Sequence, residues 1–138
     1  MSALSLKQSN ELIRIAMEKA TADYKRPICV AVCDAAGLLI SFQRMEGAPL
    51  RSIAISQGKA YSAARIQINT DAFFERVQRQ HLHTSWFCDE EITALPGGAI
   101  FKDSSGAIIG AVGISGLASE EDQAIANHLA DRLASGAV

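Results

Sequence analysis

The sequence predicts an α+β domain in which an antiparallel sheet is flanked by helices. Two pairs of short apolar runs, each pair joined by a turn-forming segment, are typical of β-hairpins. Four stretches with the helical spacing of apolar residues surround these pairs. The chain has 138 residues and shows no internal repeat or linker, so we expect a single domain over residues 1–138 with one sizeable core.

The first element is a helix over about residues 5–23. Ser5 and Gln8 have the spacing of a capping box, in which the two side chains satisfy backbone N–H groups at the helix start. The expected buried stripe consists of Leu12, Ile13, Ala16, Met17 and Ala20. Residues 25–27, Lys-Arg-Pro, end this helix because the position before a proline disfavours helical backbone.

The first strand pair spans residues 28–45. Residues 28–33 form a fully buried strand that ends at a turn, and residues 38–45 form its partner, with one face more polar than the other. Cys29 and Cys33 would lie about 13 Å apart along the first strand and cannot pair locally. We therefore expect them to be reduced, small core residues.

Two helices are expected between the strand pairs. Ser52 is a candidate N-cap for a helix over residues 53–65, and a further helix covers residues 70–81. Lys59 lies four residues from an apolar neighbour on either side, so it can project from a partly buried face, although a solvated lysine is the commoner outcome. Residues 82–96 show no clear period.

The second strand pair, over residues 99–115, leads into the last helix. Gly110 and Gly113 weaken its second strand, and glycines there usually mark the close approach of another backbone or of a ligand. They do not form a phosphate loop, because they lie within the strand and acidic residues open the next helix. Ser119 is the expected N-cap of that helix, over residues 119–133.

Asp122 has two interpretations. It follows Ser119 at the spacing of a capping box variant, but it also shares a helix face with Ile125, which aims it at the sheet. A carboxylate buried there, near Arg44 or Lys59 from neighbouring elements, would have a pKa set by burial and by those charges.

Composition restricts the function classes. The net charge of -2 argues against general nucleic-acid binding, and no apolar run approaches the roughly 20 residues that a membrane span needs. No signal peptide is visible, and the cysteine count of three is odd, so reduced thiols and a cytoplasmic location are expected.

Several motifs resemble those of the GlcG/HbpS-like family, which includes the C-terminal domain of PduO proteins. They are VAVCDAAG at residues 30–37, FQRMEGAP at 42–49, Ser52 with Lys59, PGG at 96–98 and GAIIGAVGISG at 106–116 with Asp122. The resemblance implies a profilin-like or PAS-like sheet of about five strands with helices on both faces. It also implies homo-oligomers, from dimers to octamers, and the binding of a small molecule, with haem or corrinoid as cofactors.

By position, the resemblance marks six residues as candidate site residues. They are Arg44, Lys59, Gly97, Gly98, Ser115 and Asp122. The chain departs from the family pattern in having Glu46 where aspartate is common and Ala99 where a proline often follows the paired glycines. The first helix also has no histidine, which argues against a haem-binding mode that takes its ligand from that helix.

The segment over residues 79–91 has unusual chemistry for this family. His81 and His83 precede Cys88 and three acidic residues, and such donors could hold a metal or haem. Alternatively, His81 ends the preceding helix and stabilises its C-terminus. Trp86 is a candidate pocket residue, with aromatic core filling as the alternative.

Two functions follow from these residues. The first is a cytosolic, oligomeric small-molecule-binding protein whose ligand is haem or a related tetrapyrrole. The alternative is a small catabolic enzyme that hydrolyses, deaminates or isomerises a carboxylated metabolite. In the enzyme, Arg44 and Lys59 would hold the anion, and Asp122, His81 or His83 would act as acid or base.

Overall fold

The computed structural model describes residues 3–138 and contains one antiparallel sheet. Within the described residues the sheet has four strands, in the order β2-β1-β4-β3, instead of the expected five or so. The strands are β1 (Cys29–Asp34), β2 (Leu39–Arg44), β3 (Gly98–Lys102) and β4 (Ile108–Ser115). Every neighbouring pair is antiparallel, which confirms the predicted α+β class and both hairpins.

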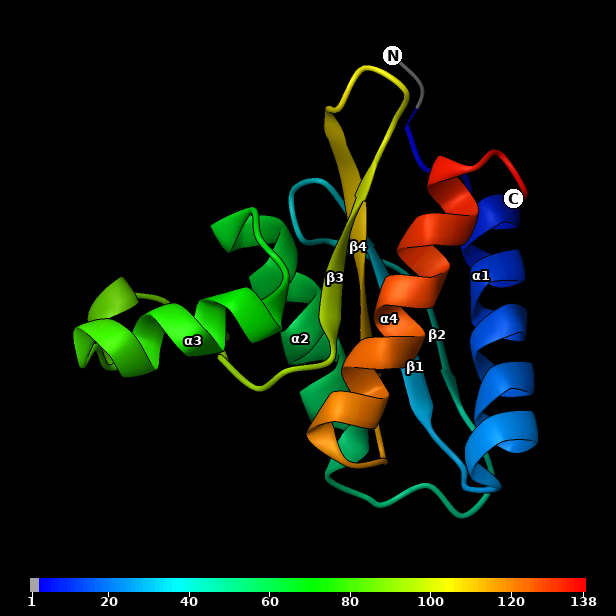
Figure 1. The fold of residues 1–138 in the computed structure, drawn as a ribbon, viewed down its shortest axis with the longest axis horizontal. Helices are drawn as coiled ribbons and strands as arrows, with labels where there is room; N and C mark the ends of the chain where they lie inside the picture. The colour runs from blue at the N-terminus through cyan, green and yellow to red at the C-terminus, as the bar shows by residue number, and fades with distance from the viewer. Residues whose placement is uncertain (1–2) are drawn as a thin grey trace.

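Helices cover both faces of the sheet, as Figure 1 shows. The helices α1 (Leu6–Lys19) and α4 (Ser119–Ala134) lie side by side on one face, and α2 (Ser52–Ile66) lies on the other. The larger core lies under α1 and α4 and is built from leucine, isoleucine, valine and phenylalanine. The smaller core under α2 is mainly alanine, so that helix sits very close to the sheet.

The close approach of α2 depends on Gly113 of β4. A Cβ atom at Gly113 would collide with the carbonyl oxygen of Ser56 and would lie 2.6 Å from the backbone nitrogen of Ala60. At Gly110 a Cβ would lie 2.5 Å from the carbonyl oxygen of Cys33. The glycines of this strand are therefore required by neighbouring backbone.

The helix ends differ in part from the sequence expectations. The Ser5 and Gln8 capping box is confirmed, and α1 continues as a π-helical turn over Ala20–Tyr24. The predicted N-caps Ser52 and Ser119 are wrong, because each lies inside its helix and the caps are Arg51 and Ala118. Both predictions followed side-chain preference, whereas the backbone turns that precede these helices set where they begin.

The helix α3 (Thr70–Gln80) and the short 3₁₀ helix η2 (Thr84–Phe87) project from the body of the domain (Figure 1). At the start of α3, the side chains of Asn69 and Thr70 accept hydrogen bonds from the backbone N–H groups of Ile100 and Gly98 in β3. These bonds occupy the outer edge of β3, which leaves β2 as the open edge of the sheet.

The cysteines of β1 agree with the expectation of small, reduced core residues. Cys29 and Cys33 are buried free thiols, and Cys88 is an exposed one. Among residues 3–138, no helix combines the length and apolar character needed to cross a bilayer.

Candidate functional site

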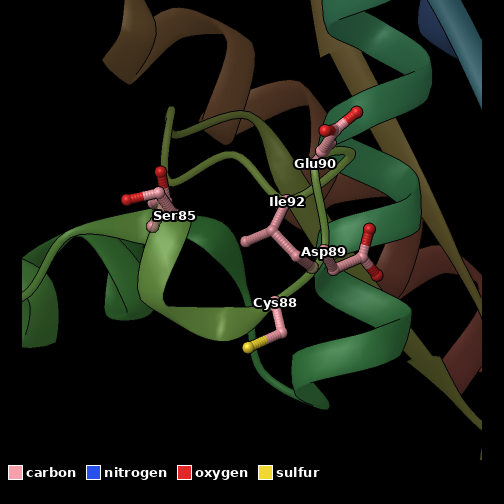
Figure 2. Close-up of a pocket in the computed structure, with 6 residues that line it drawn as sticks. Ser85, Cys88, Asp89, Glu90 and Ile92 are labelled. Carbon is pink, nitrogen blue, oxygen red and sulfur yellow. The ribbon is translucent and has the colours of Figure 1, made fainter.

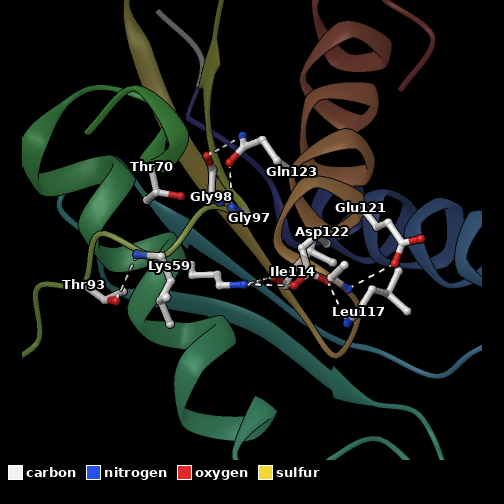
Figure 3. A network of polar contacts seen from close by, with 12 residues as sticks. Lys59, Thr70, Thr93, Gly97, Gly98, Ile114, Leu117, Glu121, Asp122 and Gln123 are labelled. Atoms are coloured by element: carbon white, nitrogen blue, oxygen red, sulfur yellow. Dashed lines mark hydrogen bonds and ion pairs between the residues drawn. The ribbon is translucent and has the colours of Figure 1, made fainter. Parts of the chain in front are cut away.

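A buried ion pair joins α2 to α4 across the end of β4. The Lys59 ammonium donates to the Asp122 carboxylate at 3.1 Å and to the carbonyl oxygen of Ile114 at 2.7 Å. Each charged side chain is only 3% exposed. The second carboxylate oxygen of Asp122 accepts from the backbone N–H of Leu117, so this residue is held on both sides (Figure 3).

Burial dominates the titration of both members of this pair. It lowers the pKa of Lys59, and the charge and hydrogen bond of Asp122 act in the opposite direction. Burial likewise raises the pKa of Asp122 to about 6, and the attraction of Lys59 opposes that shift. Burial therefore brings the pKa values of both groups closer to neutrality, which is the property an acid or base at neutral pH needs.

The stability of the protein should depend on pH through Asp122. Between its ordinary pKa of 3.8 and its folded value of about 6, the folded state retains a proton that the unfolded state has released. The free energy of unfolding should therefore fall as pH rises through this window, by up to about 3 kcal/mol relative to Asp122→Asn. Urea denaturation and carbon-13 titration of the carboxyl group measure it, and a carboxyl midpoint near the ordinary value would contradict it.

The backbone at Gly97 and Gly98 lies close against Lys59. A Cβ atom on Gly97 would lie 2.6 Å from the Lys59 ammonium, and Gly97 has a φ of +129° that other residues rarely adopt. The Gln123 side chain accepts from the N–H of Gly97 and donates to the carbonyl of Gly98 (Figure 3). The paired glycines thus let the lysine side chain pass and link β3 to α4.

A polar pocket of about 140 Å³ opens onto this pair. Besides Lys59 and Asp122, it is lined by Arg51, Ser52, Ile55, Leu95, Ser115, Gly116, Leu117 and Ser119. The pocket therefore brings together three of the six residues marked by position, with Gly97 and Gly98 just beneath the lysine. Sequence reasoning missed Arg51, whose only signal was its place next to Ser52.

Arg44 lies at the rim of this region and is not among the pocket's lining residues. It is exposed near the end of β2, directly across from Cys29, which in turn pairs with Ser115. Arg44 and Ser115 consequently share one row and one face of the sheet, about 10 Å apart over two strand spacings. The predicted cooperation of Arg44 with Lys59 stays a prediction.

The predicted histidine cluster lies on the projecting part of the chain. His81 is the C-cap of α3, as the helix-end interpretation expected, with a left-handed φ of +54°. The His83 and Trp86 rings pack 4.8 Å apart between centroids, and Trp86 is 62% exposed. Trp86 therefore fills no core position, and the structure does not bring these rings to the Lys59 and Asp122 pocket.

A hollow of about 550 Å³ lies next to this cluster. Figure 2 shows lining residues from η2 and the segment after it, namely Ser85, Cys88, Asp89, Glu90 and Ile92. Asp89 is engaged by the Tyr61 hydroxyl, which donates to it at 2.5 Å and lowers the pKa of the carboxyl group. Residues 3–138 contain no group of three or more His, Cys, Asp or Glu side chains arranged to hold a metal ion. The metal role of His81 and His83 stays a prediction.

A groove of about 470 Å³ lies between α1 and the end of β2. Its lining residues are Arg14, Met17, Glu18, Thr21, Ala22 and Met45. The walls are mostly apolar, and the Arg14 guanidinium at the groove is held by Glu11 and Glu18. The groove therefore offers an apolar surface with two thioether sulfurs close to a paired charge.

The sequence matches one protein family over nearly its whole length. The family model, described as "Haem degrading protein HbpS-like", covers residues 4–131. An uncharacterised 15.0 kDa protein of Citrobacter freundii from the dhaT-dhaS intergenic region is 30% identical over 117 residues, which are 84% of this chain and 82% of that protein.

Two solved structures share the fold. The haem complex of PduOC has a TM-score of 0.83 with 27% identity and covers 94% of both chains. A double mutant of Streptomyces reticuli HbpS has a TM-score of 0.85 with 25% identity, covering 96% of this chain and 88% of that one. Two independent similarities, in sequence and in fold, therefore extend over almost all of the described residues.

Proposed function

This chain belongs to the HbpS-like family, and we propose that it is a cytoplasmic, oligomeric protein that binds haem or a related tetrapyrrole. The description of the family and the haem complex of PduOC support a tetrapyrrole ligand. Self-association is supported by the open edge of the sheet at β2, where Leu39 is one of the exposed large apolar side chains. These side chains are Leu6, Leu38, Leu39, Leu50, Phe74, Trp86 and Leu95.

The observation that carries the proposal is the apolar groove between α1 and β2. Its volume of about 470 Å³ lies within the roughly 300–1,000 Å³ of typical cofactor and ligand sites. The hollow beside η2 is larger, but Asp89 and Glu90 line it and would repel the propionate groups of a haem. The groove is therefore the better match to a mostly apolar ligand, since its one lining carboxylate, Glu18, is paired with Arg14.

Met17 is the residue that would hold the iron in this groove, because the Met45 sulfur already accepts a hydrogen bond from the Ile28 backbone N–H. Thioether sulfur is a known axial ligand of haem iron, so the lack of a histidine in α1 does not exclude iron ligation from that helix. A bound haem would supply an iron centre with redox and ligand-binding chemistry. The flexible methionine side chains also adapt to a flat aromatic ligand.

Haemin titration of the purified protein tests this site. We expect a saturable shift of the Soret absorption, and we expect Met17→Ala to weaken haemin binding by about tenfold or more, because it removes both a ligand atom and apolar contact. A Soret band that is stable with reductant in air would identify a haem carrier, whereas bleaching would identify a haem-degrading protein.

The histidine variants are the matched comparison. His81→Ala and His83→Ala should leave haemin affinity unchanged, because both residues lie on the projecting part of the chain. Loss of binding in these variants, with Met17→Ala unaffected, would move the ligand to the segment around η2 and overturn the groove site. The absence of any Soret shift at near-stoichiometric haemin would overturn haem binding itself.

The alternative function is a small enzyme that hydrolyses, deaminates or isomerises a carboxylated metabolite. The raised pKa of Asp122 beside the polar pocket supports it, since a group that titrates near neutrality can both accept and donate a proton. Turnover of such acids that disappears in Asp122→Asn would support the enzyme, and acids left unchanged by the wild-type protein would count against it.

A further inference from the structure

The polar pocket lies where two helices begin. Arg51 and Ser52 come from the start of α2, and Ser119 and Asp122 from the start of α4. The first backbone N–H groups of a helix lack partners within that helix, and they carry partial positive charge. Two helix starts therefore meet at one small pocket, next to the network in Figure 3. The Ser52 and Ile53 N–H groups already donate to the Pro49 and Leu50 carbonyl oxygens, and the acidic first turn of α4 offsets the partial charge of that helix, so an anion here depends on side chains.

Two buried hydroxyl groups in the pocket lack a protein partner. Ser52 is 1% exposed and Ser115 is 6% exposed, and both line the pocket. Neither hydroxyl group makes a hydrogen bond to another group within residues 3–138. Every fully inaccessible side-chain nitrogen or oxygen in that range has a partner, so these two oxygens are not fully inaccessible. The hydroxyl groups must therefore reach the pocket space, where a ligand or water satisfies them.

The charge at the pocket favours an anion. Asp122 is neutralised by Lys59, and Glu121 is held outside by Arg26 at 2.6 Å. The guanidinium of Arg51 forms no ion pair with any residue in the described part of the chain and lines the pocket. Among the residues that line the pocket, one uncompensated positive charge is left, because the unpaired Glu120 lines a neighbouring hollow instead. Guanidinium matches the two oxygens of a carboxylate.

We propose that this pocket is a second ligand site, which binds a small monocarboxylate through Arg51 and the Ser52 and Ser115 hydroxyls. The volume of about 140 Å³ limits the ligand to a short acid, and Ile55, Leu95 and Leu117 provide contacts for its carbon chain. A phosphate or sulfate dianion would exceed the single free charge. The site is independent of haem binding, and the alternative enzyme would need it.

Titration with propionate and lactate, followed by proton–nitrogen NMR at constant ionic strength, tests the site. We expect saturable shifts of the Ser52, Ser115 and Ser119 amide signals, with weaker effects from sulfate. Arg51→Gln should raise the dissociation constant by about tenfold, because it removes a charge-assisted bidentate contact. Arg76→Gln on α3 is the control and should bind as the wild type does.

Three results would overturn the proposal. They are shifts that do not saturate, sulfate binding as tightly as propionate, and a loss of binding in Arg44→Gln while Arg51→Gln still binds. Ser52→Ala provides a second variant and should weaken binding severalfold. Saturable binding without turnover of either acid would support the site and count against the enzyme, so the two ideas fail separately.

Discussion

Replacing Lys59 with methionine is expected to lower the free energy of unfolding by about 3–5 kcal/mol, because it leaves Asp122 as an uncompensated buried charge. Both side chains are only 3% exposed, so water in the adjoining pocket can replace the partner only in part. The measurement is urea denaturation above pH 7, where the Asp122 carboxyl group is ionised in the unfolded chain.

The double variant Lys59→Met with Asp122→Leu should recover much of this loss. A buried ion pair repays its own desolvation only partly, so apolar groups of similar volume can replace it at low cost. Lys7→Met, an exposed position in α1, is the matched control and should change the stability by less than about 0.5 kcal/mol. A loss below about 1 kcal/mol in Lys59→Met alone would show that the pair is solvated in solution.

Of the glycine-to-alanine substitutions in the sheet, Gly113→Ala should lower the free energy of unfolding most. Its Cβ would collide with the Ser56 carbonyl, and a carbonyl in the backbone of α2 cannot move without moving the helix. We expect a loss of about 3 kcal/mol or more in the free energy of unfolding, the upper end of the cost of overpacking. Thermal and urea denaturation measure it.

Gly58→Ala in α2 is the opposite control. A Cβ atom at Gly58 would have ordinary contacts, the nearest at 3.5 Å to the Thr93 side chain. The change should raise stability by about 0.5–1 kcal/mol, because alanine loses less conformational freedom in a helix than glycine does. Equal effects of the two substitutions would mean that α2 does not pack on Gly113 as closely as described.

Local signals in the sequence were sufficient for most of the fold. Apolar period and turn residues predicted both strand pairs and all four long helices, and the capping box at Ser5 formed as its spacing indicated. The resemblance in motifs correctly predicted the family. Helix starts were predicted less well, because Ser52 and Ser119 have the side chains of a cap but not the backbone position.

Only part of the candidate site could be predicted from the sequence. The face that Asp122 shares with Ile125 correctly aimed it inward. For Lys59 the sequence allowed a partly buried position but favoured a solvated one, whereas the side chain is buried. Their pairing joins residues 63 positions apart, and no local pattern determines such a contact. The role of Arg51 could not be predicted for the same reason, because Arg51 lines the pocket only where α2 begins beside α4.

The sequence alone determined the secondary structure elements, the buried faces and the glycines that permit close packing, because these depend on neighbours a few residues away. The tertiary structure decided which charges meet and which surfaces stay open. His81 and His83 lie on the part of the chain that projects with α3 and η2, away from Asp122. Two helix starts and two unpaired hydroxyl groups lie around one pocket. The physical reason is that charge pairing and ligand pockets depend on how the helices pack against the sheet, which fixes distances between residues far apart in the chain.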